Sequence, residues 1–233
     1  MVARVRIPLG ALGPTVLPLV DQSRGRVLPT TVHVPATGPR APLVVFAHGF
    51  WGAPRKFARL FSRWAGAGYV VAAPAFPHTS DENPPPYVWE DVVNQPADVS
   101  FVLDELLARG LGDSERVGVG GFSLGGETAL AVGLHPRHAD PRVRAVVSVA
   151  GGLFHDGLAA EELLPLPLLL VHGSDDESVA HRHSADVHER APGPKELVTL
   201  DGAGHGICQD DGEPHASRVA EVTTAFWRRY LGD

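Results

Sequence analysis

The sequence is poor in sulfur and has no surplus of positive charge. It contains one cysteine, Cys208, so an internal disulfide is excluded and the fold is expected to hold by core packing alone. Its 20 Lys and Arg residues are outnumbered by 27 Asp and Glu residues, which gives a formal net charge of -7. Without a basic footprint, we expect no binding to nucleic acid or to an anionic membrane surface.

Long apolar runs are also missing. The longest ones, such as residues 165–171, have the length of a strand and fall well short of the roughly 18 residues of a membrane span. The N-terminus is apolar, but Pro8, Pro14 and Pro18 interrupt the helix that a signal peptide needs. We therefore expect a soluble protein, with the cytoplasm preferred and a secreted mature form without its leader left open.

A regular alternation of strand and helix patterns fills the rest of the sequence. Residues 42–49 are a continuous apolar run of strand length, and residues 54–68 follow with apolar side chains at helical spacing. Two short segments rich in β-branched residues, 4–9 and 26–35, come first. The pattern predicts one α/β domain over residues 1–233, with a doubly wound, mostly parallel sheet, short antiparallel N-terminal strands and helices on both faces.

The strongest local signal is GFSLG at residues 121–125, between a predicted strand and a predicted helix. A sharp strand-to-helix turn needs small residues on both sides of the serine, so that the hydroxyl stands clear of the backbone. A glycine-rich turn with a capping serine would have the same letters. The flanking strand and helix favour Ser123 as a nucleophile.

A serine nucleophile needs a base, and the base needs an orienting group. Asp175 and Asp176 follow a buried strand that ends in HG, and His205 follows the next predicted strand. The carboxyl ends of parallel strands meet at one edge of a sheet, so these side chains are expected near Ser123. The residues therefore suggest a triad in the chain order serine, aspartate, histidine.

From about Leu43 to Tyr230 the chain resembles the α/β-hydrolase family, in which the triad has this order. The segment HGSDDESV at 172–179 is similar to the family's HGxxD with a valine three residues after the aspartate. This likeness favours Asp176 as the acid and leaves Asp175 a turn or N-cap role ahead of a helix that is predicted from about Glu177.

The same resemblance implies an oxyanion hole formed by two backbone N–H groups. Leu124 follows the nucleophile, and HGFWG at 48–52 nominates Phe50 as the second donor. Trp51 either lines the acyl pocket or packs as a core or hairpin aromatic.

Residues 26–36, 48–52 and 97–107 are similar to the branch that contains dienelactone hydrolases, chlorophyllases and cutinase-like polyester hydrolases. A dienelactone hydrolase proper has cysteine where this chain has Ser123. Secreted polyester hydrolases usually carry a leader and a disulfide, neither of which is expected here, so a polyester substrate is not favoured. About a dozen residues, 153–164, stand where many relatives insert a helical cap. The resemblance thus implies an open site without a cap domain.

We expect a serine hydrolase that cleaves small-molecule or polymeric carboxylic esters through an acyl-enzyme, with no cofactor and no metal. His181 and His183 are two residues apart, whereas zinc-binding pairs on helices are four apart. A thioesterase or amidase with the same triad, and a non-catalytic ligand-binding protein on this fold, are the alternatives. The oligomeric state stays open, and a monomer is compatible with the sequence.

Overall fold

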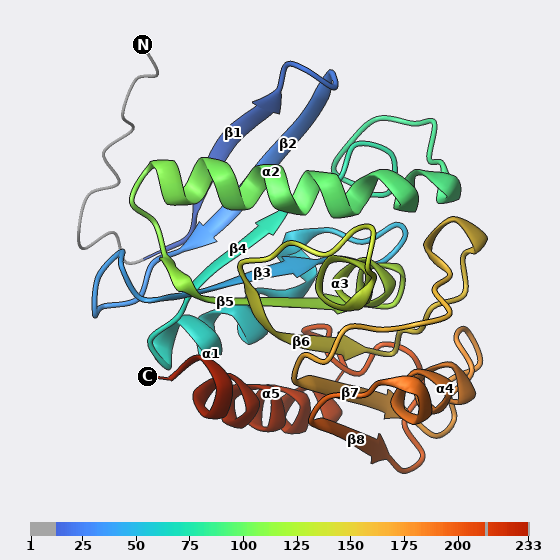
Figure 1. Cartoon of the computed structure of the whole chain (residues 1–233). Helices are drawn as coiled ribbons and strands as arrows, with labels where there is room; N and C mark the ends of the chain where they lie inside the picture. The colour runs from blue at the N-terminus through green and yellow to red at the C-terminus, as the bar shows by residue number, and fades with distance from the viewer. Residues whose placement is uncertain (1–12, 213, 233) are drawn as a thin grey trace.

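The fold is built on an eight-stranded sheet. The computed structural model describes residues 13–212 and 214–232, and its strands lie in the order β1-β2-β4-β3-β5-β6-β7-β8 (Figure 1). The strands are β1 Thr15–Asp21, β2 Arg26–His33, β3 Pro42–Ala47, β4 Val70–Pro74, β5 Asp113–Phe122, β6 Val143–Val149, β7 Leu168–Gly173 and β8 Lys195–Leu200. β2 pairs antiparallel with β1 and β4, and the remaining neighbours are parallel. The predicted fold class is confirmed, and the predicted strand over 4–9 lies outside the described residues.

Helices cover both faces of the sheet and make three layers (Figure 1). α2 (Gln95–Ala108), α3 (Leu124–Leu134) and α4 (Arg182–Arg190) pack on one face, and α1 (Ala58–Gly66) and α5 (His215–Leu231) pack on the other. β3 is buried throughout because its side chains alternate between these two cores: Leu43 and Val45 enter the first, and Val44 and Phe46 enter the second. Among the described helices, none is long and apolar enough to cross a membrane.

Short 3-10 helices interrupt the loops at the carboxyl edge of the sheet. They are η1 (Pro54–Phe57), η2 (Trp89–Asn94) and η3 (Asp156–Leu158). η2 lies in the long connection between β4 and α2. η3 is the single helical turn between β6 and β7, all of which is described, so a helical cap is absent there.

A buried ion cluster fastens the N-terminal hairpin to the layer above it. The Arg26 guanidinium donates to Asp91 Oδ1 at 2.7 Å and to Asp98 Oδ1 at 2.7 Å. Arg24 Nη2 also lies 2.7 Å from Asp98 Oδ1. Asp98 is fully buried in α2, and Asp91 belongs to η2. The cluster therefore holds η2 and α2 against β2.

Replacing Arg26 with methionine should destabilise the protein by about 3–5 kcal/mol, because two buried carboxylates lose a shared charged partner. The free energy of unfolding in urea measures the effect. Arg144→Met is the matched control, since Arg144 and its partner Glu115 are exposed, and it should cost about 1 kcal/mol or less. Equal losses in the two variants would show that the buried cluster does not stabilise the fold.

Candidate active site

Ser123 lies at the turn between β5 and α3, at the carboxyl edge of the sheet. Its backbone has φ 56° and ψ -121°, a conformation that L residues rarely adopt. A Cβ at Gly121 would lie 1.9 Å from the Gly125 carbonyl oxygen, and one at Gly125 would lie 2.1 Å from that of Ala47. Only glycine fits at these two positions, which is the physical reason for the GFSLG pattern.

The structure brings His205 between Ser123 and Asp176. Nε2 of His205 lies 2.9 Å from Ser123 Oγ, and Nδ1 lies 2.7 Å from Asp176 Oδ2. Asp175 is exposed, and its Oδ1 accepts a hydrogen bond from Ser174 Oγ at 2.7 Å. In this arrangement the imidazole can take the serine proton while a carboxylate holds its Nδ1–H.

Four N–H groups surround the Asp176 carboxylate. Oδ1 accepts from the backbone N–H groups of Ser178 and Val179, at 2.9 and 2.8 Å. Oδ2 faces His205 Nδ1 and, at 3.2 Å, Nε2 of the buried His172. These contacts fix both oxygens and thereby the orientation of the His205 ring. α4 begins at Arg182, and not near residue 177 as the sequence suggested.

His172 is a positioned imidazole that the sequence analysis missed. Its Nε2 faces the Val179 carbonyl oxygen at 2.8 Å as well as Asp176 Oδ2, so this nitrogen faces acceptors only and carries a proton. Its Nδ1 lies 2.7 Å from Ser184 Oγ. Burial lowers the pKa of His172. In the sequence, a histidine that ends an apolar strand is indistinguishable from an ordinary core histidine.

The HGFWG segment forms a tight turn after β3. The Gly49 carbonyl oxygen accepts from the Gly52 N–H at 2.9 Å and from His48 Nδ1 at 2.7 Å. His48 Nε2 accepts from the Phe76 N–H at 3.1 Å, and burial lowers the pKa of His48 to about 4, so its ring is neutral. A Cβ at Gly49 would lie 3.1 Å from Ser123 Cβ. The turn therefore abuts Ser123 in a fixed conformation.

The predicted oxyanion donors lie on the two segments that meet at Ser123. Phe50 is the second residue of the tight turn, and Leu124 is the first residue of α3. Neither backbone N–H donates to another group within residues 13–212 and 214–232. The N-terminus of a helix also favours negative charge. Both N–H groups are thus available to a bound anion.

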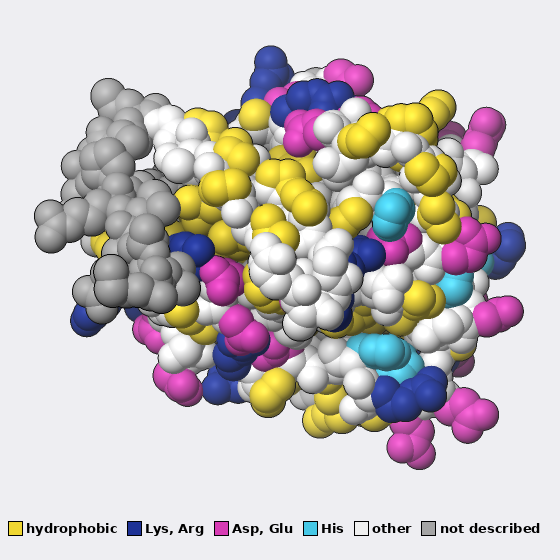
Figure 2. All heavy atoms as spheres, turned by 90° about the horizontal axis from the view of Figure 1, so that it is seen from above, with side chains coloured by type: hydrophobic (Ala, Val, Ile, Leu, Met, Phe, Trp, Pro, Cys, Tyr) yellow, Lys and Arg dark blue, Asp and Glu magenta, His cyan; other side chains and the backbone are white. Residues whose placement is uncertain are grey.

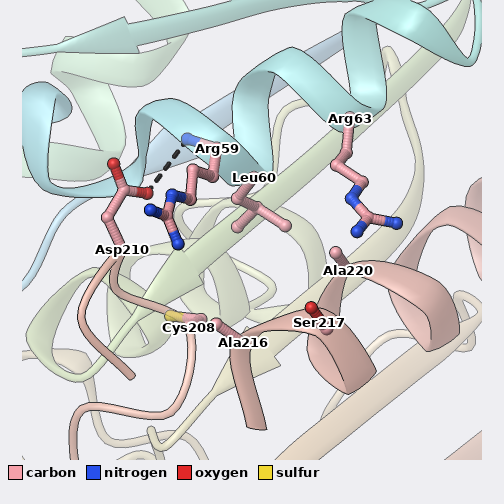
Figure 3. A pocket seen from close by; sticks show the side chains of 8 residues that line it. All are labelled: Arg59, Leu60, Arg63, Cys208, Asp210, Ala216, Ser217 and Ala220. Atoms are coloured by element: carbon pink, nitrogen blue, oxygen red, sulfur yellow. Dashed lines mark hydrogen bonds between the residues drawn. The ribbon is translucent and has the colours of Figure 1, made fainter. Parts of the chain in front are cut away.

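The loop that carries His205 is anchored to α1 (Figure 3). Asp210 Oδ1 accepts from the Arg59 N–H at 2.9 Å, and the Asp210 N–H donates to the Lys56 carbonyl oxygen at 2.8 Å. A carboxylate is favourable at a helix start. Cys208 is buried in the core between α1 and α5, and burial raises the pKa of its thiol. A cavity of about 50 Å³ lies beside it, lined by Arg59, Leu60, Arg63, Cys208, Asp210, Ala216, Ser217 and Ala220.

Glu127 is a buried carboxyl one helical turn after Ser123. Its Oε1 accepts from the backbone N–H groups of Phe154 and His155, at 2.9 and 2.7 Å. Its Oε2 has no hydrogen-bond partner among the described residues. Burial raises the pKa of Glu127 to about 7. The side chain ties α3 to the loop after β6, and nothing in the sequence marks it out from other helical glutamates.

Trp51, the predicted pocket residue, projects from the tight turn. Its backbone has φ 56°, its side chain is 59% exposed, and its ring meets that of Tyr87 at 5.7 Å. Its packing is therefore not that of a core aromatic, and a role in the acyl pocket stays a prediction.

The histidines considered for a metal make other contacts. His181 Nε2 lies 2.8 Å from Thr199 Oγ1, and the His183 ring meets that of Phe154. Among the residues that the structure describes, no three His, Cys, Asp or Glu side chains gather where they could hold a metal ion.

Comparisons with known proteins agree with this architecture. The model of the dienelactone hydrolase family matches residues 28–232. A carboxymethylenebutenolidase from Rhodococcus opacus is 30% identical over 142 residues, which are 55% of this chain and 56% of that protein, so the match spans about half of the relative.

Solved structures extend the likeness to nearly the whole fold. A ferulic acid esterase from Streptomyces cinnamoneus has a TM-score of 0.76 and 23% identity, with 94% of this chain and 89% of that chain covered. Thermogutta terrifontis esterase 2 phosphorylated by paraoxon has a TM-score of 0.73 and 20% identity, with 97% of both chains covered. At these identities the likeness concerns the fold.

The raised pKa of Glu127 should make the protein less stable as pH rises. The unfolded chain releases this proton near the ordinary pKa of 4.5, and the folded protein keeps it to about 7. Between these pH values the folded state binds more protons, so the free energy of unfolding falls as pH increases, by up to roughly 3 kcal/mol from this group.

Glu127→Gln should remove this slope, because glutamine keeps the Oε1 acceptor and does not titrate. Urea unfolding at a series of pH values from 4 to 8 measures it. Glu221→Gln serves as the control, because that carboxylate is exposed on α5. A slope that is unchanged in Glu127→Gln would contradict the assignment of the titration to Glu127.

Proposed function

The chain belongs to the dienelactone hydrolase family, and from that premise we propose that it is a serine-dependent carboxylic-ester hydrolase. The observation that carries the proposal is the continuous hydrogen-bond path from Ser123 Oγ through His205 to Asp176 Oδ2. The free N–H groups beside the serine add a place for an oxyanion. No step below needs a cofactor.

In the first half of the proposed reaction, Ser123 Oγ attacks the ester carbonyl carbon and passes its proton to His205 Nε2. Asp176 stabilises the imidazolium and keeps Nδ1–H in place. The carbonyl oxygen takes the negative charge and accepts hydrogen bonds from the Phe50 and Leu124 N–H groups, each of which is worth about 2.7–4 kcal/mol in the barrier. The carbon–oxygen bond then breaks, and His205 returns the proton to the leaving alcohol.

In the second half, water attacks the acyl-enzyme. His205 takes a proton from the water, the tetrahedral intermediate forms in the same oxyanion hole, and the bond to Ser123 Oγ breaks as the proton returns to that oxygen. The acid is released and the free serine is restored. Each half thus uses the same base and the same two donors.

The short connection between β6 and β7 supports an open site. Residues 150–167 carry only one 3-10 turn, so no helical cap has to move before an ester reaches Ser123. Such a site accepts esters whose carbonyl is near the surface of a larger molecule as well as small ones.

Ser123→Ala should abolish ester turnover and leave the fold intact. The wild type should hydrolyse p-nitrophenyl butyrate and take a covalent fluorophosphonate label, and the variant should do neither. Circular dichroism and urea unfolding control for folding. Folded wild-type protein that resists the label would refute the serine mechanism, and so would residual turnover in the variant above the rate in buffer.

Asp176→Asn should lower kcat by about 10³–10⁴, because the amide cannot hold the same imidazole tautomer. Asp175→Asn is the matched control and should keep kcat within about twofold, because Asp175 is exposed and contacts Ser174. Steady-state kinetics on both variants measure the contrast. The opposite order of effects would move the acid to Asp175.

A further inference from the structure

Four aromatic rings form a continuous row at the edge of the sheet where Ser123 lies. Phe50 meets Trp89 at a centroid distance of 5.5 Å, Trp89 stacks on Phe154 at 5.9 Å with an interplanar angle of 26°, and Phe154 meets His183 at 5.7 Å. The rings come from the turn after β3, from η2, from the loop after β6 and from α4. We call this set the aromatic row.

The aromatic row is not absorbed into the core. Phe50 and Trp89 are 36% and 37% exposed. The remaining large exposed hydrophobic side chains of the described residues are Val16, Val20 and Val27 on the N-terminal hairpin, and Trp51 and Val93 beside the row. Figure 2 shows hydrophobic side chains and histidines, interspersed with charged ones, on the right of the molecule, toward which the parallel strands point in Figure 1. Exposed rings next to a nucleophile are typical of a binding surface.

The row borders the proposed oxyanion hole. Phe50 carries one of its N–H groups, and the Phe154 side chain packs against a small core cluster that includes Leu124, the other donor. Gly49, one residue before Phe50, abuts Ser123. The first ring of the row therefore belongs to a residue whose own N–H group would contact the reacting carbonyl.

His205 lies on the other side of the nucleophile. Its ring contacts Phe122 at 4.8 Å, and Phe122 belongs to the core beneath α1 and α5. Phe154 instead packs with residues of η2, α3 and η3, on the opposite face of the sheet. Because His205 must protonate the leaving oxygen, the alcohol part of an ester lies on its side. The acyl part then points toward the aromatic row.

The row is also held rigidly. The buried Glu127 carboxyl accepts from the Phe154 and His155 N–H groups, which fixes the loop that presents the Phe154 ring. Trp89 begins η2, which the Arg26–Asp91 contact ties to β2. Rings that are ordered before binding cost little entropy when a planar group stacks on them.

We infer that the aromatic row is an acyl-binding subsite for esters of aryl-substituted carboxylic acids, with Trp89 and Phe154 as specificity-determining residues. The inference rests on the proposed ester hydrolysis at Ser123. Stacked and edge-to-face contacts favour a flat ring over a puckered one of similar size, since a saturated ring offers no π face.

The test compares trifluoroethyl phenylacetate with trifluoroethyl cyclohexylacetate, using trifluoroethyl acetate as the reference and a pH-stat to follow acid release. These esters share an aliphatic leaving group, so only the acyl ring differs. The wild type should prefer the phenyl ester in kcat/KM. Trp89→Leu and Phe154→Leu should each reduce that preference about three- to tenfold, with the rate on each ring ester taken relative to the acetate rate of the same variant.

Phe101→Leu is the matched control for Phe154→Leu. Phe101 is also half-buried, but it belongs to α2 and packs against the core between α2 and the sheet. It should keep the preference, as should Trp89→Phe, which retains a ring. Thermal unfolding of each variant checks that η2 and the loop after β6 remain folded.

Three outcomes would overturn the inference. The first is a wild-type preference near one together with normal acetate turnover, and the second is a preference that Trp89→Leu leaves intact. The third concerns a second pair of esters, phenyl acetate and cyclohexyl acetate, in which the ring is on the alcohol part. If Trp89→Leu lowered the phenyl preference for this pair and not for the phenylacetate pair, the aryl group would bind on the alcohol side. A wild type that hydrolyses none of the esters would instead refute the proposed function itself.

Discussion

The left-handed backbone of Ser123 is the constraint on which the rest of the site depends. A non-glycine residue at φ 56° is strained, and it persists only where its surroundings leave no alternative. Here the Ser123 N–H donates to Val149, and its carbonyl oxygen accepts from Gly126 and Glu127 at the start of α3. The turn is thus fastened to β6 and to its own helix at once, and the hydroxyl is the part left to project.

The candidate site is assembled from neighbouring strand ends. β3, β5, β7 and β8 run parallel, so the turn at residues 49–52, the serine turn, the Asp176 loop and the His205 loop emerge at one edge. Side chains at or near these strand ends anchor three of the segments. His48 fixes the first, His172 contacts Asp176, and Asp210 fastens the histidine loop to α1. The sheet therefore brings the segments of the site together, and local hydrogen bonds fix the conformation of each one.

The sequence predicted those features that depend on residues close together along the chain. The mostly parallel sheet followed from apolar runs and helical stripes, and Ser123, Asp176 and His205 followed from short motifs at strand ends. The contact between His205 and Asp176, and not Asp175, depended on a single residue of spacing that the family resemblance supplied. The triad roles themselves remain proposals.

Partners distant in the sequence were invisible by comparison. From the sequence, Glu127 resembles a surface glutamate, and only the structure shows that it accepts hydrogen bonds from the Phe154 and His155 N–H groups. His172 likewise resembles a core residue, and only the structure shows its ring beside Asp176. The aromatic row from Phe50 to His183 comes from four separate segments, so no spacing of residues along the sequence predicts it.

The burial of Cys208 has a practical meaning. It is the chain's one thiol, it lies three residues after His205, and its raised pKa keeps it protonated and unreactive while α1 and α5 stay closed over it. A thiol reagent would therefore react only with molecules in which this layer has opened. The rate at which such a reagent modifies Cys208 would therefore report how often the segment that holds His205 opens.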